Sequence, residues 1–291
     1  TGHRISRGRP RRGSLMAWVG LVVHEDRPEA VTQATQLAGR LTEQGHAVRR
    51  SDDPALEAAA FVDGLDLVVS MGGDGSILRA VHLLDGRPVP VLGVNFGHLG
   101  YLTTVEPTAA LDAVGRFMEG DHDLETRMML RMVVGRADGS LEEVDHALNE
   151  VVVGRAASSQ TIRVGVSLDG AFFTSYAADG LLLATPTGST AYAFSARGPI
   201  VDARHRSIQL TPVSAHMLFD RTLVLEPSTE VVLEILGDRP AACVIDGRDL
   251  GPLAEGDRVT CTASERTAHL VTFGGRDFLQ LLKAKFGLED R

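Results

Sequence analysis

Lysine is almost absent from this 291-residue sequence. Its 29 basic residues are all arginine except Lys283 and Lys285, near the C-terminal end. A Walker A loop needs a lysine after its last glycine, and a protein kinase needs one on an early strand. Both classes are therefore excluded, and any phosphate must be bound by backbone amides, a metal ion or arginine.

Cysteine is equally scarce, and Cys243 and Cys261 are not spaced as a metal-binding or redox motif. This argues against a structural zinc ion and a disulfide framework. We expect a protein of a reducing compartment, the cytoplasm.

Long hydrophobic runs are also missing, since none reaches the roughly 18–20 residues that span a bilayer. The basic stretch 4–12 is followed by only a short apolar segment without a cleavage site, so no secretory signal is predicted. Residues 1–15 are expected to form a disordered tail, or to precede a start at Met16. A net charge of −9 argues against a nucleic-acid partner.

The first half of the chain alternates short apolar runs with segments of helical periodicity, which predicts a parallel sheet covered by helices. We assign residues 16–122 to this α/β domain, which would carry the phosphate donor and the catalytic loop. Strands are predicted at 18–23, 65–71 and 89–94, and helices at 28–44, 77–84 and 108–119.

From about residue 124 the pattern changes to short β runs separated by hairpin signals, at 137–140 and 168–170. This predicts a second, mainly antiparallel β domain, residues 123–275, which would bind the acceptor. Helical spacing returns only at 277–286. Further strands are predicted at 128–134, 151–153, 161–168, 222–225, 230–236 and 242–245.

A glycine-rich turn, Gly72-Gly73-Asp74-Gly75-Ser76, follows the second predicted strand and opens a helix. Its glycines let the backbone approach a phosphate, and successive N–H groups at a helix N-terminus cradle an anion. The charge of Asp74 would repel phosphate, so this residue suits proton transfer or a place beside a metal ion. The alternative interpretation is a tight turn that only precedes a helix.

A second glycine-bearing turn, 93–102, also follows a strand, so both turns are expected at the carboxyl edge of the sheet, where open α/β folds bind ligands. Taken singly, His98 and Tyr101 in this turn favour a packing role.

The pair Asn149-Glu150 is embedded in an apolar β run and needs polar partners if it is buried. Ribose hydroxyls are suitable, because a carboxylate accepts hydrogen bonds and an amide both donates and accepts them. A charged strand end exposed to solvent is the alternative.

The longest polar motif is Thr185-Pro-Thr-Gly-Ser-Thr190, which follows a strand beginning at Asp179. Hydroxyl groups on a glycine turn suit a flat, polar ligand, and Tyr192 is placed to stack on a base. A helix cap would explain Ser189 or Thr190 alone, but not the whole cluster.

Together, the segments GGDGS, GVNFGHLGYLT, ALNEVVV, DGLLLATPTGSTAYAFSARGPI and CVIDGRD resemble the NAD kinase family in order and separation, over roughly residues 17–290. The resemblance implies an α/β N-terminal domain, a C-terminal β-sandwich and a final helix, 276–291, that packs back on the first domain. The sequence departs from the family pattern at Ser76, where threonine is common, at Arg197, where many relatives have glycine, and at Ala177, where some carry a basic residue.

The resemblance also implies residue roles. Asp74 matches the catalytic base, beside a phosphate loop of Gly72, Gly73, Gly75 and Ser76. The substrate-binding positions that it implies are Gly75, Arg79, Asn149, Glu150, Asp179, Thr187, Ser189, Thr190, Ala191, Tyr192, Ala193, Phe194, Ser195 and Arg248.

The implied reaction phosphorylates the adenosine-ribose 2′-hydroxyl of NAD, with ATP or polyphosphate as donor and Mg²⁺ held chiefly by the nucleotide. The resemblance further implies a homo-oligomer, a dimer or tetramer, whose sites a neighbouring subunit completes. Two alternatives stay open: a lipid kinase of the same fold, for which no membrane-contact segment is evident, and a non-catalytic dinucleotide sensor.

Overall fold

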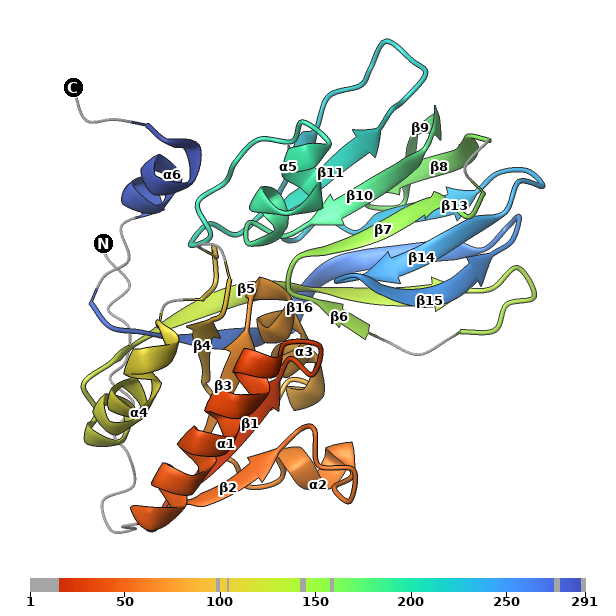
Figure 1. The fold of residues 1–291 in the computed structure, drawn as a ribbon. Helices are drawn as coiled ribbons and strands as arrows, with labels where there is room; N and C mark the ends of the chain where they lie inside the picture. The colour runs from red at the N-terminus through yellow and green to blue at the C-terminus, as the bar shows by residue number, and fades with distance from the viewer. Residues whose placement is uncertain are drawn as a thin grey trace. The chain divides into compact units, whose positions relative to one another are not determined.

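The computed structural model describes residues 16–97, 100–103, 105–141, 145–157, 160–274 and 278–288. The predicted tail of residues 1–15 lies outside this set, as do His98, residues 276 and 277, and residues 289–291 at the predicted C-terminal helix. The chain divides into two units, one formed by residues up to Thr126 together with those from Ala268 onward, the other by Arg127–Thr267. Each is described by itself (Figure 1).

The first unit is built on a parallel sheet in which neighbouring strands run in the same direction. Its apolar strand segments are buried, as expected for a sheet covered on both faces. Beyond β4 the sheet continues with the end of β16, whose Leu270 pairs with Val91. The strand order is β2 (Ala47–Arg50), β1 (Trp18–Val23), β3 (Leu67–Gly72), β4 (Val91–Asn95) and β16 (Arg258–Thr272).

Two helices, α1 (Pro28–Glu43) and α4 (Ala110–Glu119), contact each other on one face of this sheet (Figure 1). In α1 the buried residues recur with helical spacing, and Pro28 occupies the first turn, where its missing N–H costs nothing. α4 ends at Gly120 in a left-handed conformation, φ 80°. A 3₁₀ turn, η1 (Pro107–Ala109), precedes α4.

The short helix α2 (Ala58–Val62) contacts α3 (Asp74–Leu84), which packs against β1, β3 and β4. Close approach explains Gly93 on β4, because a Cβ there would lie 2.6 Å from Cδ1 of Ile77 on α3. The final helix, α6 (Phe278–Phe286), buries none of its residues and places Nζ of Lys285 4.2 Å from the ring centre of Tyr101.

The second unit consists of two mainly antiparallel sheets. One has the order β16, β13 (Val231–Ile235), β8 (Ile162–Leu168) and β9 (Ala171–Ala178), with β5 (Asp123–Gly135) paired to β16 and β6 (Asp145–Ala147) paired to β5. The other has the order β12 (Leu223–Leu225), β11 (Ile208–Val213), β10 (Gly180–Ala184), β7 (Glu150–Arg155), β14 (Ala241–Ile245) and β15 (Arg248–Leu253).

One hydrophobic cluster joins the facing sides of these two sheets into a sandwich. Alternate residues of each strand contribute to it, for example Val151 and Val153 on β7 and Val231 and Leu233 on β13. Leu183 on β10 is fully buried in this cluster. Two short helical turns, η2 (Gly188–Thr190) and α5 (Tyr192–Ser195), follow β10.

The predicted fold class, an α/β unit with a parallel sheet and a mainly antiparallel β-sandwich, is confirmed. The structure adds strands that we did not predict, among them β2, β9 and β16, and helix α3 begins at Asp74 rather than near Ile77. The early start of α3 matters for function, because it places the aspartate in the first turn of the helix.

We expect Leu183→Ala to lower the free energy of unfolding by about 2–5 kcal/mol, because a fully buried side chain would leave a cavity in the sandwich core. Leu218→Ala is the matched control in the same unit, since Leu218 is fully exposed. Its effect should stay within about 0.5 kcal/mol. Urea unfolding followed by circular dichroism measures both, and equal effects would show that this sandwich core is not packed as described.

Candidate functional site

The glycine-rich turn lies where β3 ends and α3 begins, at the carboxyl edge of the parallel sheet. Gly72 is required by space, since a Cβ there would lie 2.0 Å from Oγ of Ser76. Gly73 is the N-cap residue of α3, and no described side chain caps this helix end. The positive end of the helix dipole is therefore directed at the turn, as in sites that bind phosphate.

The Asp74 carboxylate accepts hydrogen bonds from three consecutive backbone N–H groups. Oδ2 accepts from Tyr101 at 2.7 Å, and Oδ1 accepts from Leu102 at 3.0 Å and Thr103 at 3.2 Å. Gly100 leaves room for this contact, because a Cβ there would lie 2.2 Å from Oδ1 of Asp74. The second glycine-bearing turn thus fixes the orientation of the aspartate.

Asp74 opens onto a cleft of about 650 Å³. The loop after β1 forms one wall and the start of α3 the other. The structure therefore brings together all the residues predicted for the phosphate loop, except Gly72, with Asp74 and Arg79. The lining residues are His24, Glu25, Asp26, Arg27, Gly73, Asp74, Gly75, Ser76 and Arg79.

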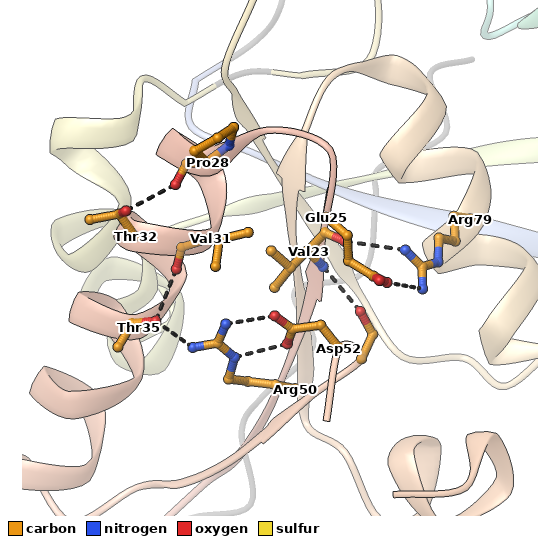
Figure 2. A network of polar contacts seen from close by, with 10 residues as sticks. Val23, Glu25, Pro28, Val31, Thr32, Thr35, Arg50, Asp52 and Arg79 are labelled. Carbon is orange, nitrogen blue, oxygen red and sulfur yellow. Dashed lines mark hydrogen bonds and ion pairs between the residues drawn. The ribbon is translucent and has the colours of Figure 1, made fainter. Parts of the chain in front are cut away.

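Charged and hydroxyl side chains form polar contacts near the end of β1 (Figure 2). Nη2 of Arg79 contacts Oε1 of Glu25 at 3.1 Å, and Nη1 donates to the carbonyl oxygen of Val23 at 3.2 Å. Arg50, at the end of β2, forms two hydrogen bonds with Asp52 and one with Thr35 of α1. The Arg50 hydrogen bond holds the pKa of Asp52 below its ordinary value.

In the second unit a buried aspartate organises the backbone of the Asn149-Glu150 segment. The Asp246 carboxylate accepts N–H bonds from Leu148 at 2.7 Å, Asn149 at 2.8 Å and Glu150 at 3.0 Å. Asp246 adopts a left-handed conformation, φ 47°, in the turn between β14 and β15. Burial raises its pKa, against the opposing effect of these hydrogen bonds.

The side chains of Asn149 and Glu150 are themselves buried. Oδ1 of Asn149 and Oε2 of Glu150 have no hydrogen-bond partner within the described part of the chain. Burial raises the pKa of Glu150 to about 7, and the Asp246 carboxylate adds to the shift, whereas the N–H of Tyr192 opposes it. Each side chain of the pair therefore has one buried oxygen that lacks a donor, which is unusual in a folded protein.

The polar loop after β10 packs directly on this pair. The Thr185 hydroxyl donates to the carbonyl oxygen of Leu148 at 2.6 Å, and the Thr185 backbone N–H donates to the carbonyl oxygen of Asn149 at 2.9 Å. Glycine is needed at position 188, because a Cβ there would lie 2.2 Å from the backbone carbonyl oxygen of Asn149. Ser189 bridges to the backbone of Val201.

The structure separates the predicted substrate-binding residues of this loop into two groups. Thr187, Ser189 and Ala193 are buried, and their accessible surface is small. Tyr192 and Phe194 are exposed, as is Ser195, while Thr190 and Ala191 are partly exposed. The side chains of the second group are accessible to solvent, whereas those of the first group are enclosed by the protein.

Asp179 does not lie beside Glu150. Asp179 directly precedes Gly180, the first residue of β10, whereas Glu150 on β7 pairs with Ala184, the last residue of β10. At about 3.3 Å per residue, this separation is roughly 16 Å. Oδ1 of Asp179 instead forms an ion pair with Arg155 at 2.9 Å.

Arg248 lies one residue after the Asp246-Gly247 turn and forms an ion pair with Asp145 at 2.5 Å. Sequence reasoning placed Arg248 near the ligand but gave Asp246 no role. The roles of Glu25 and Arg155 were also missed. Only the Asp-Gly dipeptide at 246–247, a hairpin signal, could have drawn attention to Asp246.

No helix among the described residues is both long and apolar enough to cross a lipid bilayer.

A phosphate-accepting turn on an α/β unit, followed in the chain by a β-sandwich with an unsatisfied polar pair, defines a two-domain nucleotide-binding protein. Two family models match the chain: the ATP-NAD kinase N-terminal domain over residues 51–122 and the ATP-NAD kinase C-terminal domain over residues 148–273. The chain belongs to the NAD kinase family.

Similar proteins match more than nine tenths of the chain. An NAD kinase of Heliobacterium modesticaldum is 36% identical over 279 residues, which cover 93% of this chain and 98% of that one. NAD kinase 1 of Streptomyces avermitilis is 34% identical over 313 residues, covering 94% and 87%.

Two solved structures have the same fold. Yeast NADH kinase complexed with NADH has a TM-score of 0.88 at 23% identity, covering 95% of this chain and 89% of that one. An NAD kinase from Archaeoglobus fulgidus in complex with ATP has a TM-score of 0.70 at 25% identity, covering 94% and 97%.

The raised pKa of Glu150 predicts a pH-dependent stability of the ligand-free protein. The unfolded chain releases this proton near the ordinary value of 4.5, and the folded chain releases it near 7. The free energy of unfolding should therefore fall by at most about 3 kcal/mol as pH rises from about 4.5 to 7. Above pH 7 it should level off. Glu150→Gln should remove this fall.

Thermal melting between pH 5 and 8 measures the effect. The stabilisation of Glu150→Gln over wild type should be small at pH 5 and largest at pH 8. Glu230→Gln is the control, because Glu230 is exposed in the same unit. A difference that does not vary with pH would contradict the shifted titration.

Proposed function

We propose that this protein transfers a phosphoryl group from ATP, or from polyphosphate, to the 2′-hydroxyl of the adenosine ribose of NAD. The observation that carries the proposal is the buried Asn149-Glu150 pair, in which Oδ1 of Asn149 and Oε2 of Glu150 lack partners within the described part of the chain. Vicinal ribose hydroxyls would supply the missing donors, and the Asn149 amide would complete the contact. The relatives named NAD kinase, and the fold neighbours with NADH and with ATP, support the same substrates.

In this proposal Asp74 is the general base. A carboxylate is far too weak a base to ionise a ribose hydroxyl in advance. Asp74 therefore orients the hydroxyl and accepts its proton as the reaction proceeds. The 2′-oxygen forms its bond to the transferred phosphorus while the bond from that phosphorus to the bridging oxygen of the donor breaks. The three N–H groups that grip Asp74 hold its oxygens in one orientation.

The donor's phosphates would occupy the cleft beside the glycine-rich turn. The backbone N–H of Gly75, the helix dipole and the Arg79 guanidinium would bind their oxygens. This arrangement needs no lysine, in keeping with the sequence.

The described residues do not fit a metal ion held by the protein. No group of three or more His, Cys, Asp or Glu side chains in this part of the chain could hold one, and both Asp74 oxygens already accept N–H bonds. We therefore assign the expected Mg²⁺ to the donor phosphates, where it would neutralise charge.

Incubation of the purified protein with NAD, ATP and Mg²⁺ tests the function, with NADP assayed by an NADP-specific dehydrogenase. ³¹P NMR of the product should show a 2′-phosphate. In a parallel incubation with diacylglycerol vesicles in place of NAD, a phosphorylated lipid, together with no NADP in the first reaction, would identify a lipid kinase. Tight NAD binding without turnover would identify a dinucleotide sensor.

Asp74→Asn should lower turnover by about 10²–10⁴-fold, the usual effect of losing a general base, and change NAD affinity little. The asparagine amide would also place an NH₂ group against a backbone N–H, which would cost a hydrogen bond and lower stability. Turnover is therefore measured below the melting temperature of the variant. Asp112→Asn, at an exposed position of α4, is the control for loss of a charge. A variant that retains more than about a tenth of wild-type turnover would overturn the assignment.

We further propose a cytoplasmic homo-oligomer, a dimer or tetramer. The two cysteines are free and buried, which suits a reducing compartment. On the second unit Phe172, Phe173 and Phe219 are exposed. Exposed aromatic groups of this kind are typical of protein interfaces.

Sedimentation velocity should give a mass that is a multiple of the 31.1 kDa chain. Phe172→Ser should shift the equilibrium toward the monomer, because Phe172 exposes 68% of its surface. Full activity in a wild-type monomer would contradict this assignment.

A further inference from the structure

The Arg79 guanidinium makes contact with a carboxylate inside the cleft. Its Nη2 lies 3.1 Å from Oε1 of Glu25, and both residues line the same space as Asp74 and Ser76. Arg79 comes from α3, whereas Glu25 belongs to the loop after β1 (Figure 2). The pair thus bridges the two walls of the cleft, at the place where donor phosphates are proposed to bind.

This ion pair contributes little to stability. Both side chains are substantially exposed, 43% for Arg79 and 57% for Glu25, and exposed pairs of this kind stabilise proteins only weakly. Arg79 has a separate anchor, because its Nη1 donates to the carbonyl oxygen of Val23 at 3.2 Å. The guanidinium would therefore keep its place if the carboxylate moved away.

We infer that Glu25 is a specificity-determining residue that occupies Arg79 in place of a donor phosphate and is displaced when the donor binds. A phosphate group carries more charge than a carboxylate and can accept two parallel N–H bonds from arginine. It therefore outcompetes Glu25, whereas a weakly charged ligand does not. The consequence is a lower donor affinity than the cleft would otherwise have, and selection for ligands with a phosphate chain.

The charges around the cleft support displacement. Its carboxylates belong to Glu25, Asp26 and Asp74, and its guanidiniums to Arg27 and Arg79. Arg27 donates to the carbonyl oxygen of Phe96, so its position is fixed by the backbone. Once a phosphate replaces Glu25 on Arg79, the freed carboxylate lies on an exposed loop and can turn into solvent.

The inference rests on the proposed binding of donor phosphates in this cleft. Calorimetry with a non-hydrolysable ATP analogue and Mg²⁺ tests it on wild type, Glu25→Gln, Arg79→Met and the double variant. Glu25→Gln should tighten binding about two- to fivefold, the scale of an exposed ion pair. Arg79→Met should weaken binding, and Glu25→Gln should then bring no gain in the Arg79→Met background.

Glu29→Gln is the matched control. Glu29 is exposed, lies four residues further along on α1 and is absent from the cleft lining, so its change measures the general effect of removing one negative charge. A gain from Glu25→Gln no larger than that from Glu29→Gln would overturn the inference. An equal gain in donor affinity from Glu25→Gln in the wild-type and Arg79→Met backgrounds would also overturn the inference. Melting curves establish that each variant is folded.

Tripolyphosphate as a second probe identifies the ligand group. Tightening by Glu25→Gln with both probes would show that the phosphate chain alone displaces the carboxylate. Tightening with the ATP analogue alone would assign the displacement to a nucleotide, and tightening with neither would overturn the inference.

The NADP assay on wild type separates this test from that of the proposed function. NADP formation with unchanged donor affinity in Glu25→Gln would reject the role of Glu25 and keep the function. Tighter donor binding by Glu25→Gln that depends on Arg79, in a protein that makes no NADP, would support the role of Glu25 and reject the proposed function.

Discussion

In both units an aspartate carboxylate accepts hydrogen bonds from three consecutive backbone N–H groups. Asp74 binds residues 101–103, and Asp246 binds residues 148–150. Each contact joins segments that are distant in sequence, and each fixes the backbone beside the residues proposed to act on the substrate. Hydrogen bonds to a charged acceptor are stronger than those between neutral groups, so one side chain can order a whole loop.

The two carboxylates differ in their exposure to solvent. Asp74 lies on an open cleft, whereas Asp246 is buried beside Glu150, whose pKa is raised first by burial and further by the Asp246 charge. The ligand-free second unit therefore contains two acidic groups close together and acceptor oxygens without donors. A ligand that supplies hydroxyl donors would relieve both costs at once. Strain of this kind is commonly concentrated at functional sites.

Much of the fold could be predicted from the sequence, because periodicity reports burial. β1 and α1 were predicted within about a residue, since fully buried strands are continuous apolar runs and α1 has one apolar face. β16 was missed because Ser264, Glu265 and Arg266 interrupt its alternation in the middle of a 15-residue strand. β9 was missed because it begins with the exposed pair Phe172 and Phe173, which resembles neither strand pattern.

For the sites, the glycine turns and the Asn149-Glu150 pair were visible as motifs, but their partners were not. Asp246 is separated from Glu150 by 96 residues and Glu25 from Arg79 by 54, and no local pattern encodes such contacts. Arginine explains why those partners matter. Arg79, Arg155 and Arg248 each form an ion pair with a carboxylate, so their positive charges are matched within the chain. Guanidinium groups paired in this way do not attract polyanions indiscriminately. On the inference drawn for Arg79, such a group would bind a phosphate only when the phosphate's charge and geometry suit it better than those of the carboxylate that it replaces.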